Sequence, residues 1–223
     1  MSRRVIALIP AYNEVARVGE VVARTRPQVD EVIVIDDGSS DGTAAAAEQA
    51  GARVLRHEQN RGKGGAIATA LDYFGRSDAE FAILLDADGQ HDPAEIAKFV
   101  ETADREQADI VVGTRMGDTS KMPVVRRLTN EFTSWVTSRL AGQRIPDSQC
   151  GYRLLRRNVL EDLRLSTARF ETETEMLIQT ARAGHKIISI PIRTIYESGH
   201  TSHIHPVRDT IRFFTFVRKY WKA

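Results

Sequence analysis

Cysteine is nearly absent from this chain of 223 residues, since Cys150 carries its only thiol. A disulfide framework within the chain and a zinc site built from several cysteines are therefore excluded. Long apolar runs are also lacking, because none approaches the roughly 20 residues that a membrane-spanning helix needs. The apolar stretch at 5–10 is too short for a signal peptide. We expect a soluble, reduced, cytoplasmic protein.

Excess charge of either sign is missing too, because 31 lysine and arginine residues nearly balance 30 aspartate and glutamate residues to give a net charge of +1. Global charge therefore does not indicate a nucleic-acid partner, and we expect none. The charges are nonetheless separated along the chain. Ten acidic and two basic residues fall in 78–109, three acidic and eight basic in 118–157, and one acidic and five basic in 204–223. Patches of opposite charge are what a metal site and an anion site require.

Apolar runs and helix-like stretches alternate through the first half of the chain. The runs predict strands at 5–9, 32–35, 52–55, 81–85 and 110–113, and the stretches between them predict helices at 15–26, 43–50, 64–74 and 93–106. This alternation is typical of an α/β protein with a mostly parallel sheet flanked by helices. Ligands bind such sheets beyond the carboxyl ends of the strands. We therefore expect the loops after Ile9, Ile35 and Leu85 to lie together.

The second half of the chain is less regular. It predicts helices at 124–141, 173–183 and 206–221 and one strand at 187–191. No long linker, internal repeat or low-complexity segment interrupts it. The expected fold is therefore a single α/β domain over 1–223.

Two common nucleotide-binding loops are missing. The loop after the first predicted strand has no Gly-x-Gly-x-x-Gly, so it is not a dinucleotide-binding turn. The segment 61–65, Arg-Gly-Lys-Gly-Gly, lacks both the upstream glycine and the serine or threonine after Lys63 that a Walker A phosphate loop requires. Any nucleotide must be bound in another way.

Acidic residues follow the fourth predicted strand, in Asp86-Ala-Asp88. Side chains at i and i+2 of an extended segment point the same way, so the two carboxylates would converge on one point of the ligand crevice. A divalent cation would relieve their repulsion and would bind these oxygens together with waters and substrate phosphates. Gln90 continues the spacing. The alternative is ordinary turn chemistry, which an Asp-x-Asp-Gly segment also provides.

Several motifs occur together in one order along the chain. They are Pro10-Ala-Tyr-Asn-Glu14, Asp36-Asp-Gly-Ser39, Asn60-Arg-Gly-Lys-Gly64, Leu85-Asp-Ala-Asp-Gly-Gln90, Val112-Gly-Thr-Arg115 and Asp147-Ser-Gln-Cys-Gly-Tyr-Arg153. With these motifs the chain resembles, over its whole length, the family 2 inverting glycosyltransferases with a GT-A fold. Within that family it is most similar to the polyprenyl-phosphate sugar transferases, the group that contains dolichyl-phosphate mannose synthase.

The resemblance implies a donor site at the strand ends. The nucleotide-sugar-binding residues would be Pro10, Tyr12, Asn13, Glu14, Asp36, Asp37, Lys63 and Asp86. Mg²⁺ or Mn²⁺ would be held by Asp86, Asp88 and Gln90 and would neutralise the diphosphate that leaves. Either His203 or His205 would contact the metal or the donor phosphates.

Basic residues in the middle of the chain suit a phosphate acceptor. A hydroxyl acceptor needs a positioned base, whereas a phosphate monoester, with a second pKa of about 6, arrives ionised and needs cations. The resemblance implies that Arg115 and Arg126 match arginines that grip the lipid phosphate. We expect Arg115, Arg126, Arg127 and Arg153 to bind the acceptor, and Asp88, Arg115 and Arg126 to be catalytic. The alternative for the arginines at the helix start is a solvated helix face.

Two further features have open alternatives. Glu171, Glu173 and Glu175 either supply a base for a hydroxyl acceptor or occupy a helix N-terminus, where acidic side chains are favourable. Glu173 is the better functional candidate of the three. The predicted helix at 206–221 combines aromatic and basic residues, so it either lies in an anionic membrane interface or packs against the core.

The predicted function is transfer of a sugar from a GDP- or UDP-sugar to polyprenyl or dolichyl phosphate, by metal-dependent direct displacement with inversion. Residues 1–115 would bind the donor, and 116–223 would bind the acceptor and end in the amphipathic helix. The expected location is the cytoplasm, including peripheral contact with the cytoplasmic face of the membrane. A membrane-anchoring partner protein or a homo-oligomer stays open. The alternatives are a glycosyltransferase with a hydroxyl or soluble phosphorylated acceptor, a sugar-phosphate nucleotidyltransferase and a non-catalytic nucleotide-sugar sensor.

Overall fold

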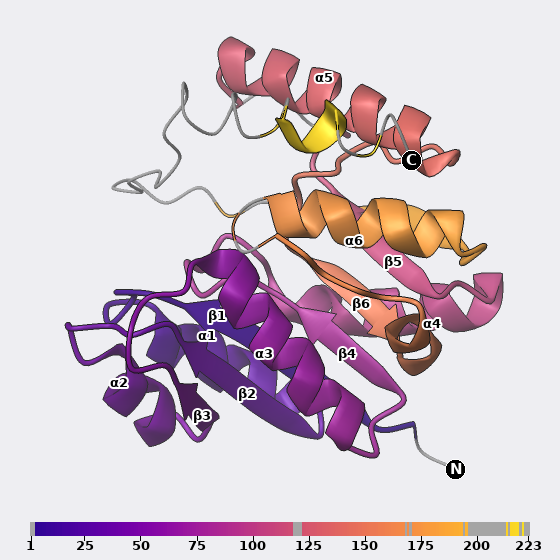
Figure 1. The fold of residues 1–223 in the computed structure, drawn as a ribbon. Coiled ribbons are helices and arrows are strands. Elements are labelled where there is room, and N and C mark those ends of the chain that lie inside the picture. The colour runs from indigo at the N-terminus through magenta and orange to yellow at the C-terminus, as the bar shows by residue number, and fades with distance from the viewer. Residues whose placement is uncertain are drawn as a thin grey trace.

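Seven strands form one sheet in the described part of the computed structural model, which comprises residues 3–117, 122–167, 169, 171–193, 195, 213, 215–218 and 220. Their order across the sheet is β3-β2-β1-β4-β6-β5-β7. The strands are β1 (Val5–Ala11), β2 (Glu31–Asp36), β3 (Arg53–Arg56), β4 (Phe81–Leu84), β5 (Ile110–Thr114), β6 (Arg153–Arg156) and β7 (Ile187–Pro191). Figure 1 shows the strands at the centre with helices packed around them.

The sheet is mostly parallel, as the sequence predicts. β1 pairs with β2 and β4, β2 pairs with β3, and β5 pairs with β7, all in parallel. β6 runs antiparallel between β4 and β5. The sequence analysis missed β6 because this strand has only four residues, and Arg153 and Arg156 at its ends flank a single apolar pair. Such a segment lacks the longer apolar run by which a buried strand is recognised.

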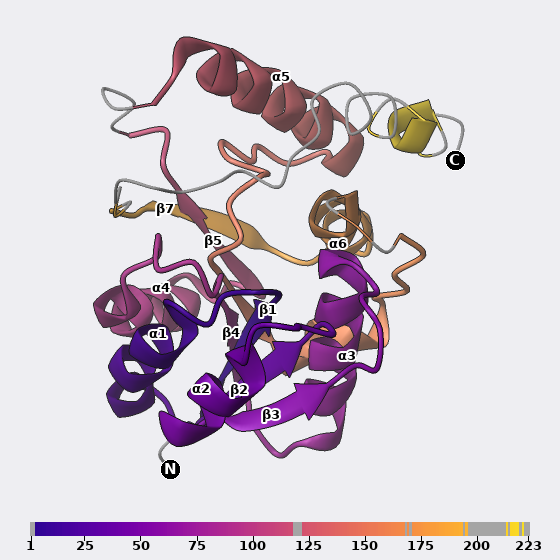
Figure 2. The same ribbon diagram turned by 90° about the vertical axis from the view of Figure 1, so that its left-hand side faces the viewer.

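Helices cover both faces of the sheet. They are α1 (Val18–Thr25), α2 (Thr43–Gln49), α3 (Lys63–Arg76), α4 (Ile96–Glu106), α5 (Val124–Ala141) and α6 (Glu171–Arg182). Figure 2 shows α1 and α4 on one side of the sheet and α3 and α6 on the other, with α5 packed on α6 outside these layers. Among the helices of the described ranges, none has the combined length and apolar character that crossing a membrane requires.

Two helices, α1 and α4, begin three residues later than the sequence predicts. α1 begins three residues later than expected, because the carbonyl oxygen of Glu14 accepts hydrogen bonds from the amides of Arg17 and Val18 and a turn comes first. Pro93 opens a short 3₁₀ helix (Pro93–Glu95), and α4 begins only after it. The helix expected at 206–221 falls largely outside the described residues.

Apolar side chains fill the space between the sheet and the helices. β1 and β2 are buried along nearly their whole length, because helices cover both faces of the sheet. This burial explains why their sequences are continuously apolar instead of alternating. Phe74 of α3 and Phe99 of α4 are fully buried and belong to the same core.

The strand order changes direction at β1. From β1 the sheet continues to β2 and β3 on one side and to β4 on the other. β1, β2 and β4 are parallel, so the loops that follow them meet at one edge, as the sequence predicts. A switch point of this kind is where α/β sheets bind ligands.

Candidate active site

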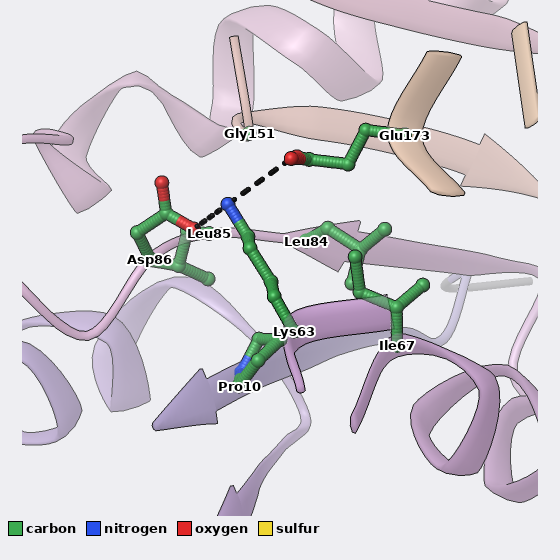
Figure 3. Close-up of a pocket in the computed structure, with 8 residues that line it drawn as sticks. All are labelled: Pro10, Lys63, Ile67, Leu84, Leu85, Asp86, Gly151 and Glu173. Carbon is green, nitrogen blue, oxygen red and sulfur yellow. Dashed lines mark ion pairs between the residues drawn. The ribbon is translucent and has the colours of Figure 1, made fainter. Parts of the chain in front are cut away.

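Three charged side chains meet at this edge of the sheet. Asp86 follows β4, Lys63 begins α3, and Glu173 lies in the first turn of α6. The Nζ of Lys63 is 2.7 Å from Oδ1 of Asp86 and 3.3 Å from Oε2 of Glu173. Figure 3 shows the lysine between the two carboxylates. Together they line a pocket of about 180 Å³, a volume that includes the solvent at its mouth.

Mutual attraction keeps two of these groups charged. Burial alone would lower the pKa of Lys63, but the charges of Asp86 and then Glu173 outweigh burial and raise that pKa above its ordinary value. Burial alone would raise the pKa of Asp86, but Lys63 and then His91 hold it below its ordinary range. At neutral pH an ammonium group and a carboxylate therefore lie side by side in one pocket.

The loop after β4 is a turn that also carries the two aspartates. Oδ1 of Asp88 accepts a hydrogen bond of 2.9 Å from the amide of Gln90, which is the turn chemistry expected as the alternative for this segment. The amide of Asp86 donates to Nδ1 of His91 at 3.2 Å. Burial lowers the pKa of His91, so its ring is neutral near pH 7 and can accept this bond. The turn fixes the backbone from which both carboxylates project.

The donor set of this loop fits a divalent cation. In the ranges that the structure describes, no three carboxylate, imidazole or thiol groups gather as a metal site would require. Mg²⁺ commonly binds one or two carboxylates and completes its shell with waters and substrate phosphates. Asp86 and Asp88 supply hard oxygen ligands of this kind on one short loop. His203 and His205, expected as further contacts, lie outside the described residues.

The segment 147–153 packs directly against the acidic loop. A Cβ on Gly151 would lie 2.7 Å from Oδ2 of Asp86, which is closer than real Cβ contacts allow. The ring of Tyr152 stacks on the ring of His91, with 4.9 Å between centroids. The position of Asp86 therefore depends on a glycine and an aromatic ring supplied by a distant part of the chain.

A buried ion pair fixes Arg115, which follows β5. Its Nε and Nη2 each lie 2.8 Å from a carboxylate oxygen of Asp147, and its backbone amide donates to the same carboxylate at 3.1 Å. Arg115 is 8% exposed and Asp147 is fully buried. Burial would lower the pKa of the guanidinium, but the hydrogen bond to Asp147 outweighs it and raises that pKa. Arg115 is therefore a permanent, oriented cation near Asp86.

The other expected acceptor residues have different surroundings. Arg126 is exposed in the first turn of α5, and Nε of Arg127 lies 3.8 Å from Oε1 of Glu131. Arg153 is fully buried, and its guanidinium donates to the carbonyl oxygens of Cys150, Ser148 and Glu173 at 2.6–2.8 Å. Because it has no exposed surface in this conformation, Arg153 holds the start of α6 instead of offering a surface to an acceptor.

The loops after β1 and β2 are tied to each other. The amide of Asn13 donates to Oγ of Ser39 at 2.9 Å, and the amide of Ser40 donates to Oδ1 of Asn13 at 3.0 Å. Asn13 has a left-handed backbone with φ of 55°, which asparagine tolerates better than most residues. Tyr12 stays 41% exposed beside this link. A ring held at the rim in this way can stack on a nucleotide base, as the resemblance implies. Pro10 lines the pocket below, and the amide of Glu14 donates to Thr43.

Asp36 and Asp37, expected to bind the base and ribose, are buried and bonded within the protein. Asp37 accepts from the amides of Arg61 and Gly62 at 2.8 Å and lies 2.7 Å from Nδ1 of His57. Asp36 accepts from the amide of Ser39 at 3.0 Å. In this conformation Asp37 shapes the loop that leads into Lys63, whereas Asp36 fixes the turn after β2. The contact of the two carboxylates with a nucleotide stays a prediction.

The three glutamates of α6 divide by role. Glu175 is fully buried and accepts hydrogen bonds from the amides and hydroxyls of Ser166 and Thr167 at 2.6–2.9 Å. It therefore has a structural role, but it fixes the loop before the helix and does not lie in the first turn of α6. Glu171 is half-buried at the helix start. Glu173 is the one of the three that reaches the pocket.

Sequence reasoning assigned no role to Asp147, Gly151 or His91. One signal was available for Asp147, which is one of only three acidic residues in the basic segment 118–157. Asp147 and Gly151 also belong to the motif Asp147-Ser-Gln-Cys-Gly-Tyr-Arg153 on which the family resemblance rests. The contact of Gly151 with Asp86, a side chain far away in the sequence, follows only from the fold. His91 looks like any polar residue after a turn.

The family model for Glycosyl transferase family 2 matches residues 6–164. A similar relative is the UDP-N-acetylglucosamine–dolichyl-phosphate N-acetylglucosaminyltransferase of Methanococcus voltae, 32% identical over 212 residues that cover 85% of this chain and 84% of the relative. Another is the polyprenol monophosphomannose synthase of Mycolicibacterium smegmatis, 32% identical over 206 residues that cover 86% of this chain and 77% of the relative.

A solved structure shares the fold. Glucosyl-3-phosphoglycerate synthase of Mycobacterium tuberculosis, in complex with Mn²⁺, UDP-glucose and glycerol 3-phosphate, superposes with a TM-score of 0.69 at 22% identity. The match covers 99% of this chain and 79% of that one. It confirms the predicted GT-A arrangement of a mostly parallel sheet flanked by helices.

Proposed function

The chain belongs to glycosyl transferase family 2, and on that premise we propose that this glycosyltransferase moves a sugar from a nucleoside diphosphate donor to a polyprenyl phosphate. The two relatives with 32% identity are named for transfer to dolichyl phosphate and for synthesis of polyprenol monophosphomannose. We propose the same class of acceptor here, met at the cytoplasmic face of a membrane. The sugar and the base, uracil or guanine, are for experiment to identify.

One observation carries the choice of a phosphate acceptor over a hydroxyl acceptor. Glu173, the best candidate for a base, has Lys63 at 3.3 Å and Arg153 at 4.0 Å from its carboxylate oxygens. Glu175 is already bonded to Ser166 and Thr167. A hydroxyl acceptor needs a base directed at its proton, and these carboxylates are directed at the protein's own cations and amides. An ionised phosphate needs no base.

On the donor side, the Tyr12 ring would stack on the base, and Lys63 would place its charge near the diphosphate. Asp86 and Asp88 would hold Mg²⁺ or Mn²⁺. When bound, that ion neutralises the charge that develops on the departing diphosphate. The relative with the same fold was solved with Mn²⁺ and UDP-glucose together, which supports this assignment for the donor chemistry.

On the acceptor side, Arg115 and Arg126 would position the lipid phosphate. Asp147 holds Nε and Nη2 of Arg115, so the guanidinium presents its Nη1 edge without further reorganisation. An oxygen of the acceptor phosphate then bonds to the anomeric carbon while the bond from that carbon to the donor diphosphate breaks. Attack opposite the leaving group inverts the configuration at the anomeric carbon.

The test is a transfer assay with the purified full chain. UDP- and GDP-sugars are each offered to a polyprenyl phosphate, to the matching polyprenol and to glycerol 3-phosphate, with Mg²⁺, Mn²⁺ or EDTA. We expect a glycolipid and a released nucleoside diphosphate only with the polyprenyl phosphate and a metal. Equal use of the polyprenol, or release of pyrophosphate, would overturn the proposal.

A pair of variants tests the metal assignment. Asp88→Asn keeps the shape of the side chain and should abolish turnover without unfolding the protein. Asp72→Asn removes an exposed carboxylate of α3 that pairs with Arg76 of the same helix, and it should change nothing. Full metal-dependent activity of Asp88→Asn would remove that residue from the metal site.

A further inference from the structure

The outward face of α5 is apolar. Val124, Val125, Leu128, Phe132 and Trp135 are 62%, 78%, 55%, 45% and 56% exposed. They are five of the seven large apolar side chains that are exposed in the described ranges. Exposed apolar residues scattered singly need no explanation, but a contiguous patch indicates a binding surface.

These five side chains form one stripe along the helix. At 100° per residue they fall within an arc of about 100°, and Phe132 and Trp135 are in ring contact with 6.3 Å between centroids. The opposite, buried face of α5 is mixed. It carries the polar residues Asn130, Thr133, Ser134 and Thr137 beside Val136, Leu140 and Ala141. Thr133 and Thr137 donate their hydroxyl protons to the helix's own carbonyl oxygens. An ordinary surface helix exposes polar residues, whereas the exposed face of α5 carries large apolar side chains.

From this exposed apolar face we infer that α5 lies in the interface of an anionic bilayer, with its apolar stripe among the lipids. The inference rests on the proposed function, because a polyprenyl phosphate brings the enzyme to a membrane. The charges of the helix fit this occupant: Arg126, Arg127 and Arg139 against Glu131 give a net charge of +2. Arg139 lies on the same helical face as the apolar stripe, one turn beyond Trp135. Arginines beside an aromatic apolar face are typical of helices at anionic interfaces.

The length of α5 and the position of Arg126 in its first turn also fit a location at the membrane surface. Its 18 residues span about 27 Å, which suits contact along the membrane surface. Arg126, in its first turn, is an expected ligand of the acceptor phosphate, and lipid phosphates lie at headgroup level. A second copy of the chain fits this face less well. A twofold contact between two such stripes would bring the arginines of both helices together with only one glutamate on each side.

Membrane binding is measured directly, without any substrate. The chain has two tryptophans, so Trp221→Phe leaves Trp135 as the single fluorescent reporter. Vesicles of phosphatidylcholine, with or without phosphatidylglycerol, are titrated into this otherwise intact chain. We expect a blue shift of Trp135 emission that grows with the phosphatidylglycerol content and weakens in high salt.

A matched pair of variants locates the contact. Leu128→Glu combined with Phe132→Glu should weaken vesicle binding about tenfold or more, whereas Ala97→Glu, an exposed position of α4, should leave it unchanged. Both variants should keep the native circular dichroism spectrum, because the substituted side chains are exposed. The double variant should still glycosylate a short, water-soluble polyprenyl phosphate and should lose activity on a long-chain acceptor in vesicles.

The outcomes separate this inference from the proposed function. Vesicle binding that the double variant retains in full, or no vesicle binding at all, overturns the inference even if lipid phosphates are glycosylated. A dimer in light scattering that becomes monomeric in the double variant also overturns it, since a second copy would then cover the face. Vesicle binding that depends on Leu128 and Phe132, without sugar transfer to any lipid phosphate, supports the inference and refutes the proposed function.

Discussion

Replacing Asp147 by asparagine should destabilise the protein strongly, because it leaves a buried guanidinium without its counter-charge. The asparagine side chain would keep the size and shape of the aspartate and remove only the charge. Arg115 cannot release its proton, since its pKa is already raised by the hydrogen bond that it donates to this carboxylate. The variant would therefore carry an uncompensated cation that is 8% exposed.

The expected size follows from the burial of the pair. Removing one member of a buried ion pair commonly costs about 3–5 kcal/mol, and here two bonds of 2.8 Å and one of 3.1 Å are weakened together. For a domain of this length, each kcal/mol lowers the melting temperature by about 2–4 °C. The melting temperature of Asp147→Asn should therefore fall by about 6–20 °C. Asp72→Asn, which breaks an exposed pair within α3, should cost less than about 1 kcal/mol.

The pH dependence gives a second readout. Burial alone would raise the pKa of Asp147, but its hydrogen bond and ion pair with Arg115 lower it below the ordinary value. A carboxylate with a lowered native pKa adds stability above its unfolded-state pKa of about 3.9 and loses it as the pH falls through the native value. As the pH falls below 5, the free energy of unfolding should therefore decrease less in the variant than in the wild type.

The measurement is urea unfolding of wild type, Asp147→Asn and Asp72→Asn, followed by circular dichroism at several pH values. A loss of less than about 1 kcal/mol for Asp147→Asn, equal to that of Asp72→Asn, would refute the reasoning. The double variant Arg115→Met with Asp147→Leu completes the comparison. It should be more stable than Asp147→Asn, because an apolar pair leaves no buried charge.

Three further substitutions separate positioning from folding. Gly151→Ala brings a methyl group to 2.7 Å from Oδ2 of Asp86. The displaced carboxylate should lower kcat about 100-fold with only a small shift of the urea midpoint. An unchanged kcat would show that the loop relaxes freely. Lys63→Met removes the cation beside Asp86, so isothermal titration should show tighter Mn²⁺ binding and the transfer assay slower turnover. Weaker Mn²⁺ binding would contradict that account. Glu175→Gln should cost about 2–4 kcal/mol in urea unfolding and leave the KM for the donor unchanged, and a variant as stable as the wild type would show that its hydrogen bonds are dispensable.

Sequence reasoning recovered the parts of the fold that depend on local pattern. The bounds of α5 and β7 match their predicted ranges, and β1, β2 and β5 differ by one or two residues at their ends. These segments carry a clear period or a continuous apolar run, which is the signal that burial imposes on a sequence. β6 was missed because its burial comes from pairing with β4 and β5, which its own four residues do not reveal.

The candidate site likewise combines residues that the sequence indicates with contacts that only the fold shows. Asp86 and Lys63 were singled out by motif and Glu173 by the alternation of three glutamates, but their ion pairs join the starts or ends of three elements and follow only from the fold. Arg153 was expected to bind the acceptor, which requires an accessible cation, and arginines are rarely buried. The fold surrounds it with three carbonyl oxygens that accept its hydrogen bonds, and no local sequence feature predicts these contacts.

The antiparallel β6 makes the positions of Asp86 and Arg115 interdependent. Its residues come late in the chain, yet they are inserted between β4, which leads to Asp86, and β5, which leads to Arg115. A fragment ending at residue 115 would lack this strand and would leave the edges of β4 and β5 unpaired, where other chains could add and aggregate. A chimera that took residues 116–223, the proposed acceptor half, from a homologue would also receive a foreign β6, and with it a new alignment of the aspartates. Changing acceptor preference by segment exchange should therefore disturb sugar-nucleotide binding as well.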